Sequence, residues 1–168
     1  VGQPNFLTPD VVVEAAKNAL DQGQHGYTRS QGSEEVCDAV ATFLGRYNLS
    51  VDGNDVVVTP GCKQALLYAM MSCLNAGDEV LLLAPAWPSY DGMLKLIGVV
   101  PIHVPVKRED YHPNMEAIRN AITSKTKAII INSPNNPTGA VYFPSEIEEL
   151  VQISVENDLW IFDDMIYS

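Results

Sequence analysis

The stretch Ala128-Ile-Ile-Ile-Asn-Ser-Pro-Asn-Asn-Pro-Thr-Gly139 joins an apolar run to a crowded turn. The run has no polar face, which is typical of a strand that lies inside a sheet covered on both sides. Residues 132–139 hold two prolines, three asparagines and one glycine, which are the residue types that set tight turns. We therefore expect a buried strand that ends in a rigid loop, whose amides can bond a ligand oxygen without adding charge.

Outward from this stretch, short apolar runs alternate with helical patterns. The apolar runs cover residues 56–59, 80–84, 99–104, 128–132 and 160–163. The helical patterns cover residues 10–20, 33–47, 64–74, 90–96, 115–122 and 145–157. This order predicts an α/β fold with three layers, in which helices cover both faces of a mostly parallel sheet.

Two helix starts carry cap signals. Thr8 is the expected N-cap of the first helix, with Pro9 at the first helical position. Ser145 and Glu148 have the spacing of a capping box at the start of the last helix.

The composition of the chain argues against several classes of function. The chain has 168 residues, 46% of them hydrophobic, and a net charge of -11, which disfavours nucleic-acid binding. Cys37, Cys62 and Cys73 lack metal-type spacing, so we expect reduced thiols, no metal site and a cytoplasmic location. No apolar run approaches the length of a membrane span, and the absence of an initiator Met at Val1 indicates a cut chain.

The loop Thr59-Pro-Gly-Cys-Lys-Gln64 leads from an apolar run into a helix. Backbone N–H groups of Gly61, Cys62 and Lys63 at a helix start favour an anion such as a phosphate. Taken alone, an ordinary strand-to-helix turn is the stronger interpretation. The loop has neither of the glycine patterns typical of dinucleotide and nucleoside-triphosphate sites.

Two more loops follow predicted strands. In Ala84-Pro-Ala-Trp-Pro-Ser-Tyr90, Trp87 stands between prolines and suits stacking on a flat ring, although alone it reads as a lid on the core. In Asp163-Asp-Met-Ile-Tyr167, Asp164 suits a protonated ring nitrogen and Tyr167 a hydrogen bond to the same ligand. A carboxylate at a strand end is otherwise usually a helix cap or a surface group.

Together these loops describe one ligand: a flat ring with a phosphate, a protonated ring nitrogen and an anionic ring oxygen. Pyridoxal 5'-phosphate has all of these features. Loops at the carboxyl ends of parallel strands are the place where such a ligand binds.

The sequence also resembles the fold-type I pyridoxal-phosphate enzymes, in particular the class I/II aminotransferases. The family pattern N-x-P-x-N-P-T-G stands at residues 132–139, and D-x-x-Y at residues 164–167. Four further matches occur in family order, at residues 2–6, 27–32, 59–66 and 85–90.

The resemblance implies a role for each matching residue. Asp164 pairs with the pyridine nitrogen, and Asn136 and Tyr167 bond the 3'-oxygen. The N–H groups of Gly61, Cys62 and Lys63 bind the phosphate, and Trp87 stacks on the ring. Tyr27 reaches the phosphate of the neighbouring subunit in a homodimer, and Gly2 and Asn136 lie at the substrate. Asn132 and Asn135 are expected to shape the turn.

Several positions depart from the family pattern. Val36 and Cys37 stand where many relatives have Leu-Arg, and Met165 replaces the usual Glu. The three-residue step to Tyr167 favours Asp164 over Asp163 as the ring partner. The Schiff-base lysine of the family lies downstream of D-x-x-Y, so we expect none of the six lysines of this chain to be the catalytic nucleophile.

We therefore expect the N-terminal part of an aminotransferase that exchanges an amino group between an amino acid and a 2-oxo acid. Residues 1–30 are expected to form an N-terminal segment with the inter-subunit loop, and residues 31–168 part of the cofactor-binding large domain. A C-S lyase, an aminocyclopropane-carboxylate synthase or a decarboxylase of the same fold remains open. A third alternative is the non-enzymatic effector domain of a transcription regulator, although the acidic chain shows no winged helix-turn-helix segment.

Overall fold

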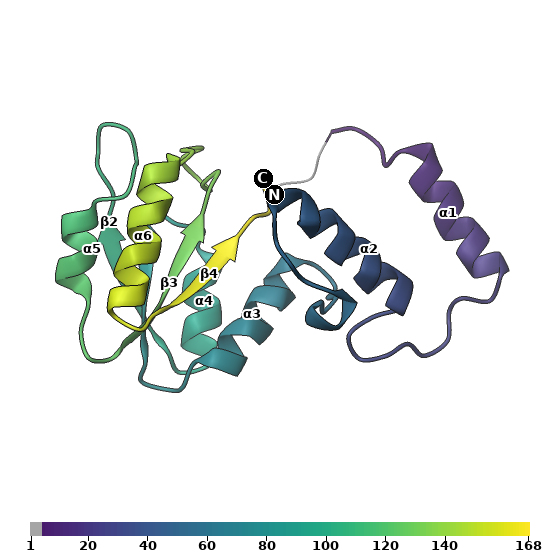
Figure 1. Cartoon of the computed structure of the whole chain (residues 1–168), viewed down its shortest axis with the longest axis horizontal. Coiled ribbons are helices and arrows are strands. Elements are labelled where there is room, and N and C mark those ends of the chain that lie inside the picture. Colours follow the sequence, from purple (N-terminus) through teal and green to yellow (C-terminus); the bar gives the residue numbers. More distant parts are fainter. Residues whose placement is uncertain (1–4) are drawn as a thin grey trace. The chain divides into compact units, whose positions relative to one another are not determined.

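The structure, a computed structural model, describes residues 5–168. The chain divides into two compact units, Val1–Val58 and Thr59–Ser168 (Figure 1). The boundary expected after residue 30 concerns the domains of a longer protein and stays a prediction. Within residues 5–168, no helix combines the length and the apolar character that crossing a membrane requires, and no three metal-binding side chains gather.

The first unit is mainly helical. It contains α1 (Asp10–Asp21), α2 (Glu34–Leu44) and two short 3-10 turns, η1 (Gly45–Tyr47) and η2 (Gly53–Asp55). Its small core consists of Cys37, Ala41 and Val56. As expected, a second helix follows Ser33, whose hydroxyl accepts a hydrogen bond from the backbone N–H of Val36 at 3.4 Å.

The second unit is the α/β sheet that the sequence predicts. Its strands are β1 (Glu79–Ala84), β2 (Val100–Pro105), β3 (Thr126–Asn132) and β4 (Trp160–Asp164). They pair in the order β2-β1-β3-β4, and every pair is parallel. Four helices accompany the strands: α3 (Cys62–Cys73), α4 (Ser89–Leu96), α5 (Met115–Ala121) and α6 (Pro144–Glu156).

Helices cover both faces of this sheet, which confirms the three-layer prediction (Figure 1). Val80 and Leu82 of β1 pack with α3 and α4, whereas Leu81 and Leu83 pack with α5 and α6. Successive side chains of a strand point to opposite faces, so a strand between two helical layers needs apolar residues throughout. Each fully buried aliphatic side chain contributes roughly 1.5–3 kcal/mol through its burial.

One predicted strand is absent from the described residues. Residues 56–59 have strand-like composition but form no ladder, and the backbone N–H of Val58 bonds only the carbonyl oxygen of Gln31, at 2.8 Å. A strand exists only when a neighbour takes up its backbone groups, and composition alone cannot supply that neighbour.

Both predicted caps were wrong by one or two residues. Pro9 occupies the N-cap position of α1 without a side-chain hydrogen bond, so Thr8 lies too early. Helix α6 begins at Pro144, whose ring presets the dihedral angle of a first helical residue. Glu146, rather than Glu148, caps this helix by accepting a hydrogen bond from the backbone N–H of Phe143 at 2.9 Å.

Candidate cofactor site at the carboxyl edge of the sheet

The candidate site lies where β1, β3 and β4 end. Because the strands are parallel, their carboxyl ends share one edge of the sheet. From β1 the chain passes to β2 on one side, and from β3 it passes to β4 on the other. Ligands of open α/β sheets bind at such a reversal of strand order. The loops that leave these three strands contain Trp87, Asn136 and Tyr167.

Asp164 ends β4 and is almost fully buried, with 5% of its surface exposed. Its Oδ2 accepts a hydrogen bond from the Tyr90 hydroxyl at 2.6 Å. Its Oδ1 accepts one from the backbone N–H of Ile166 at 3.2 Å and lies 3.7 Å from Sγ of Cys62. The carboxylate is therefore held by groups from three separate segments.

Asp163 lies on the opposite face of β4, because neighbouring strand residues alternate. It lines a cavity with Ile131, Ile147 and Ile161. Desolvation and the neighbouring charge of Asp164 raise the pKa of Asp163. Asp164, and not Asp163, thus shares its face of β4 with Tyr90 and Cys62. The choice of Asp164 as the partner of a ring nitrogen stays a prediction.

The environment of Asp164 changes the acidity of two neighbours. Burial, the hydrogen bond to Asp164 and the charge of that carboxylate raise the pKa of Tyr90 far above its ordinary range. Burial and the same carboxylate raise the pKa of the Cys62 thiol. Tyr90 therefore stays a neutral donor, and Cys62 is a poor nucleophile because its thiolate is disfavoured.

The asparagines of residues 132–139 divide into two groups. Asn132 donates to the carbonyl oxygen of Asp164 at 2.9 Å and accepts from the backbone N–H of Asn136 at 2.8 Å. Asn135 accepts from the backbone N–H and the hydroxyl of Thr138. Both fix the loop, as expected. Asn136 instead points its amide at the hydroxyl of Tyr167, 3.3 Å away, so that these two polar groups are presented together.

Helix α3 begins at the same edge, since Cys62 contacts Asp164. Gly61 has a φ of 94°, a conformation that favours glycine. Within residues 5–168, the backbone N–H groups of Cys62 and Lys63 have no hydrogen-bond partner, and the positive end of the helix dipole lies there. The backbone N–H of Gly61, which was also expected to bind a phosphate, instead donates to the carbonyl oxygen of Thr59 at 2.7 Å.

Trp87 is half-buried in the loop after β1. Its ring and the ring of Tyr90 meet in a T-shaped arrangement, with the ring centres 5.3 Å apart and the planes at 89°. The ammonium of Lys63 lies 5.1 Å from the centre of the Trp87 ring. Lys63 is the second residue of α3, so this cation–π contact links the indole to the start of that helix.

Other residues considered in the sequence analysis do not lie in the cluster around Asp164. Tyr27 belongs to the first unit, where its side chain is fully exposed, and its expected role stays a prediction. Gly2 lies outside the described residues. The described lysines other than Lys63 lie elsewhere: Lys17, Lys95 and Lys107 form ion pairs with Glu14, Asp91 and Glu146, while Lys125 and Lys127 are exposed at the start of β3.

The sequence did not reveal that Tyr90 and Cys62 hold Asp164. These contacts join residues 74 and 102 positions apart in the chain. The one available signal was that Tyr90 stands three residues after Trp87 in a motif that already pointed to a ligand.

The fold and this edge of the sheet define a known class of protein. The model of the class I and II aminotransferase family matches residues 1–168, and the chain belongs to that family.

Individual relatives agree with this assignment. The chain is 44% identical over 168 residues to the aspartate/prephenate aminotransferase of Thermus thermophilus, and 39% identical over 171 residues to the aspartate aminotransferase of Sulfolobus acidocaldarius. Each match covers 99% of this chain but only 44% and 43% of the respective relative. The chain thus spans less than half the length of these curated relatives.

Solved structures show the same fold. The Thermus thermophilus aspartate aminotransferase with maleate superimposes with a TM-score of 0.96 at 43% identity, over 99% of this chain and 44% of that one. The alanine aminotransferase of Pyrococcus furiosus gives a TM-score of 0.93 at 34% identity, over 97% and 42%. The four-stranded sheet with its helices is therefore the arrangement that these aminotransferases share with residues 1–168.

Proposed function

We propose that this chain is the N-terminal part of a pyridoxal 5'-phosphate-dependent aminotransferase and supplies much of its cofactor site. One observation carries the proposal. At one edge of the sheet, loops and a helix start present a buried carboxylate, an Asn–Tyr pair, an indole ring and two N–H groups that have no hydrogen-bond partner within residues 5–168. These donors and acceptors fit a flat, phosphorylated pyridinium ring.

Each residue has a definite task in this proposal. Asp164 holds the proton on the ring nitrogen, because a carboxylate favours the cationic form of a nearby base. Asn136 and Tyr167 donate hydrogen bonds to the ring oxygen, and Asn136 also lies at the substrate. The N–H groups of Cys62 and Lys63 receive the phosphate, with Gly61 shaping the turn that exposes them. Trp87 covers one face of the ring.

The bound cofactor supplies an electron sink for the α-carbon of an amino acid, which allows the amino group to pass to a 2-oxo acid. The residues of this chain hold that sink in place. The lysine that attaches the cofactor is expected from polypeptide beyond Ser168. We also propose a homodimer, in which Tyr27 reaches the phosphate in the neighbouring subunit and Gly2 lies near the substrate carboxylate.

The relatives guide the choice of substrate. Proteins at 39–44% identity are named aspartate or aspartate/prephenate aminotransferases, so aspartate is the first amino donor to test. A 2-oxo acid is the matching acceptor. Release of ammonia without any acceptor would point instead to lyase chemistry on the same fold.

The test uses the extended protein, in which residues 1–168 are followed by the polypeptide that is encoded downstream. The wild type should bind pyridoxal 5'-phosphate with a visible absorbance band and convert aspartate and a 2-oxo acid. Asp164→Ala should weaken both the band and the conversion. Asp163→Ala is the matched control, because this neighbouring carboxylate lies on the opposite face of β4. An extended wild-type protein that never binds the cofactor would sink the proposal.

A further inference from the structure

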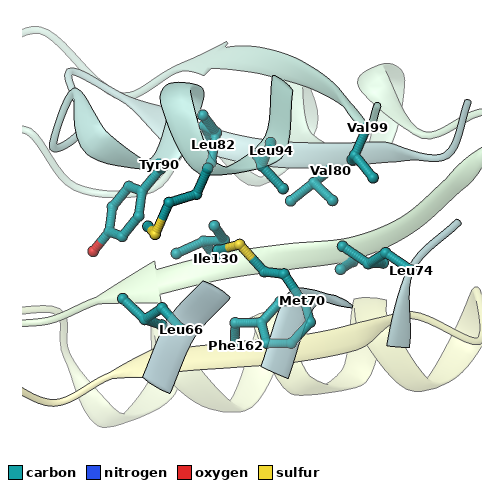
Figure 2. Close-up of a cluster of buried hydrophobic side chains, with 12 residues drawn as sticks. Leu66, Met70, Leu74, Val80, Leu82, Tyr90, Leu94, Val99, Ile130 and Phe162 are labelled. Atoms are coloured by element: carbon teal, nitrogen blue, oxygen red, sulfur yellow. The ribbon is translucent and has the colours of Figure 1, made fainter. Parts of the chain in front are cut away.

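Tyr90 has an unusual position for a polar side chain. It lies in the first turn of α4, and only 2% of its surface is exposed. Its ring packs in the apolar cluster between the sheet and helices α3 and α4, near Leu82 and Leu66. Figure 2 shows the ring at one end of this cluster, with the hydroxyl oxygen directed away from the labelled apolar side chains. Packing thus fixes the ring, and the ring fixes the place of its hydroxyl.

The hydroxyl of Tyr90 has one partner, Oδ2 of Asp164, at the short distance of 2.6 Å. The other donors reach Oδ1: the backbone N–H of Ile166 and, at longer range, the thiol of Cys62. Among the described residues, Tyr90 is therefore the sole donor to Oδ2. Hydrogen bonds to a charged acceptor are stronger and shorter than neutral ones, and this bond determines how the carboxylate is rotated.

The same ring supports Trp87. The two rings meet edge to face, an arrangement that contributes about 0.5–1.5 kcal/mol beyond the buried area. The indole also packs against the apolar cluster between the sheet and helices α3 and α4, and its remaining polar neighbour is the exposed side chain of Lys63. Tyr90 thus touches two residues that the proposed function places on different sides of the cofactor: Asp164 at the ring nitrogen and Trp87 on the ring face.

We propose that Tyr90 is a positioning residue that holds Asp164 and Trp87 in the relative arrangement in which both meet the cofactor ring. This inference rests on the proposed function and deepens it. In this arrangement Tyr90 has no direct role at the cofactor, because its hydroxyl is taken up by Asp164 and its ring packs in the apolar cluster. It acts through Asp164 by its hydroxyl and through Trp87 by its ring, so the two actions can be separated by substitution.

Tyr90→Phe in the extended protein removes the hydroxyl and keeps the ring. The probe is pyridoxamine 5'-phosphate, which makes no covalent bond to a lysine, so its dissociation constant reports the site alone. Loss of a hydrogen bond that orients a charged group should weaken binding about tenfold. The visible circular dichroism of the bound cofactor should also change, because it depends on how the ring is held.

Tyr142→Phe is the matched control. Tyr142 is another buried tyrosine, with 6% of its surface exposed, but among residues 5–168 its hydroxyl has no hydrogen-bond partner. This substitution should leave the dissociation constant and the circular dichroism unchanged. Thermal unfolding of both variants should show that each is folded, because a phenylalanine fills nearly the same space as a tyrosine.

A double-mutant cycle tests whether Tyr90 acts through Asp164. The effect of Tyr90→Phe on the dissociation constant should largely vanish in an Asp164→Asn background. The inference would be overturned if Tyr90→Phe alone bound pyridoxamine 5'-phosphate as tightly as the wild type. It would also be overturned if Tyr90→Phe weakened binding equally in the Asp164→Asn background. A wild type that does not bind pyridoxamine 5'-phosphate would instead overturn the proposed function on which the inference rests.

Discussion

Nδ1 of His112 lies 2.6 Å from Oε2 of Glu146, so the loop after β2 is tied to the first turn of α6. Both side chains are nearly buried, with exposed fractions of 11% and 13%. The ring of Phe143 stacks on the imidazole at 4.7 Å between centres. Tyr142, the residue before Phe143, donates its backbone N–H to the hydroxyl of Ser133 at 2.9 Å. The contact between His112 and Glu146 therefore also restrains the loop after β3.

Glu146 should make stability depend on pH. Burial works to raise the pKa of Glu146, but the hydrogen bonds from His112 and from the backbone N–H of Phe143, with the nearby positive charge of Lys107, outweigh it and lower the pKa below its ordinary value of 4.5. A lowered pKa means that the folded protein favours the ionised form. This contribution to stability is present above pH 4.5 and is lost as the pH falls through the lowered value.

Glu146→Gln in the extended protein should therefore lower the free energy of unfolding by about 1.5–3 kcal/mol at neutral pH. The difference from the wild type should shrink as the pH falls below 4.5. Urea unfolding at several pH values measures it. Glu148→Gln, an exposed position on the same helix, is the control and should change little. A difference for Glu146→Gln that does not vary with pH would contradict the assignment.

Gly98 should resist substitution. It follows α4 with a φ of 78°, and a Cβ atom there would lie 2.9 Å from Cβ of Ala76. Gly98→Ala should cost about 1–3 kcal/mol, because backbone strain and the close contact add. Gly92→Ala, inside α4 with open space around it, should instead raise stability by about 0.5–1 kcal/mol. Chemical unfolding of the two variants gives the comparison, and equal effects would refute the explanation.

Asn132 should be essential to the shape of the candidate site. Asn132→Ala removes the partners of the buried carbonyl oxygen of Asp164 and of the partly buried backbone N–H of Asn136. We expect a loss of at least about 2 kcal/mol and weaker binding of pyridoxamine 5'-phosphate. Asn157→Ala is the control, since its amide bonds the carbonyl oxygen of Ile153 at an exposed helix end. Unchanged cofactor binding by the Asn132 variant would argue against this coupling.

The two edges of the sheet differ in how well they are protected. The N–H groups of Val100 and Val106 point to β1, so the alternate residues of β2 face outward, and two of these, Pro101 and Pro105, have no N–H to offer. Prolines of this kind block the addition of a strand. The outer edge of β4 has no proline, and Trp160 on this strand is 58% exposed.

The outer edge of β4 pairs with no strand among residues 5–168. Residues 1–168 expressed alone should therefore associate through this edge, or unfold at low denaturant. Light scattering after size-exclusion chromatography and urea unfolding would measure this. The extended protein should associate less and unfold at higher urea concentration, because its additional polypeptide is expected to cover this edge. A monomer of residues 1–168 with one cooperative unfolding transition would show that β4 needs no further partner.

Local patterns were enough to predict most elements of the second unit. All of its helices and the four strands expected within it occur within a few residues of the expected places. Continuous aliphatic runs such as residues 128–131 are informative, because a short run rich in β-branched isoleucine and without a polar face favours a strand that is covered on both sides. The strand expected at residues 56–59 and the caps at Thr8 and Ser145 failed, because each depended on a partner or a chain direction that short patterns do not contain.

By itself the sequence determined the α/β layers, the family and the residue types of the candidate site, since apolar periodicity and turn chemistry are local properties. Only the tertiary structure decided which polar groups meet. The hydroxyl of Tyr90 meets Asp164, and His112 meets Glu146, across 74 and 34 residues of chain. The physical reason is that sheet pairing and helix packing, rather than spacing along the chain, bring such distant side chains within hydrogen-bond reach.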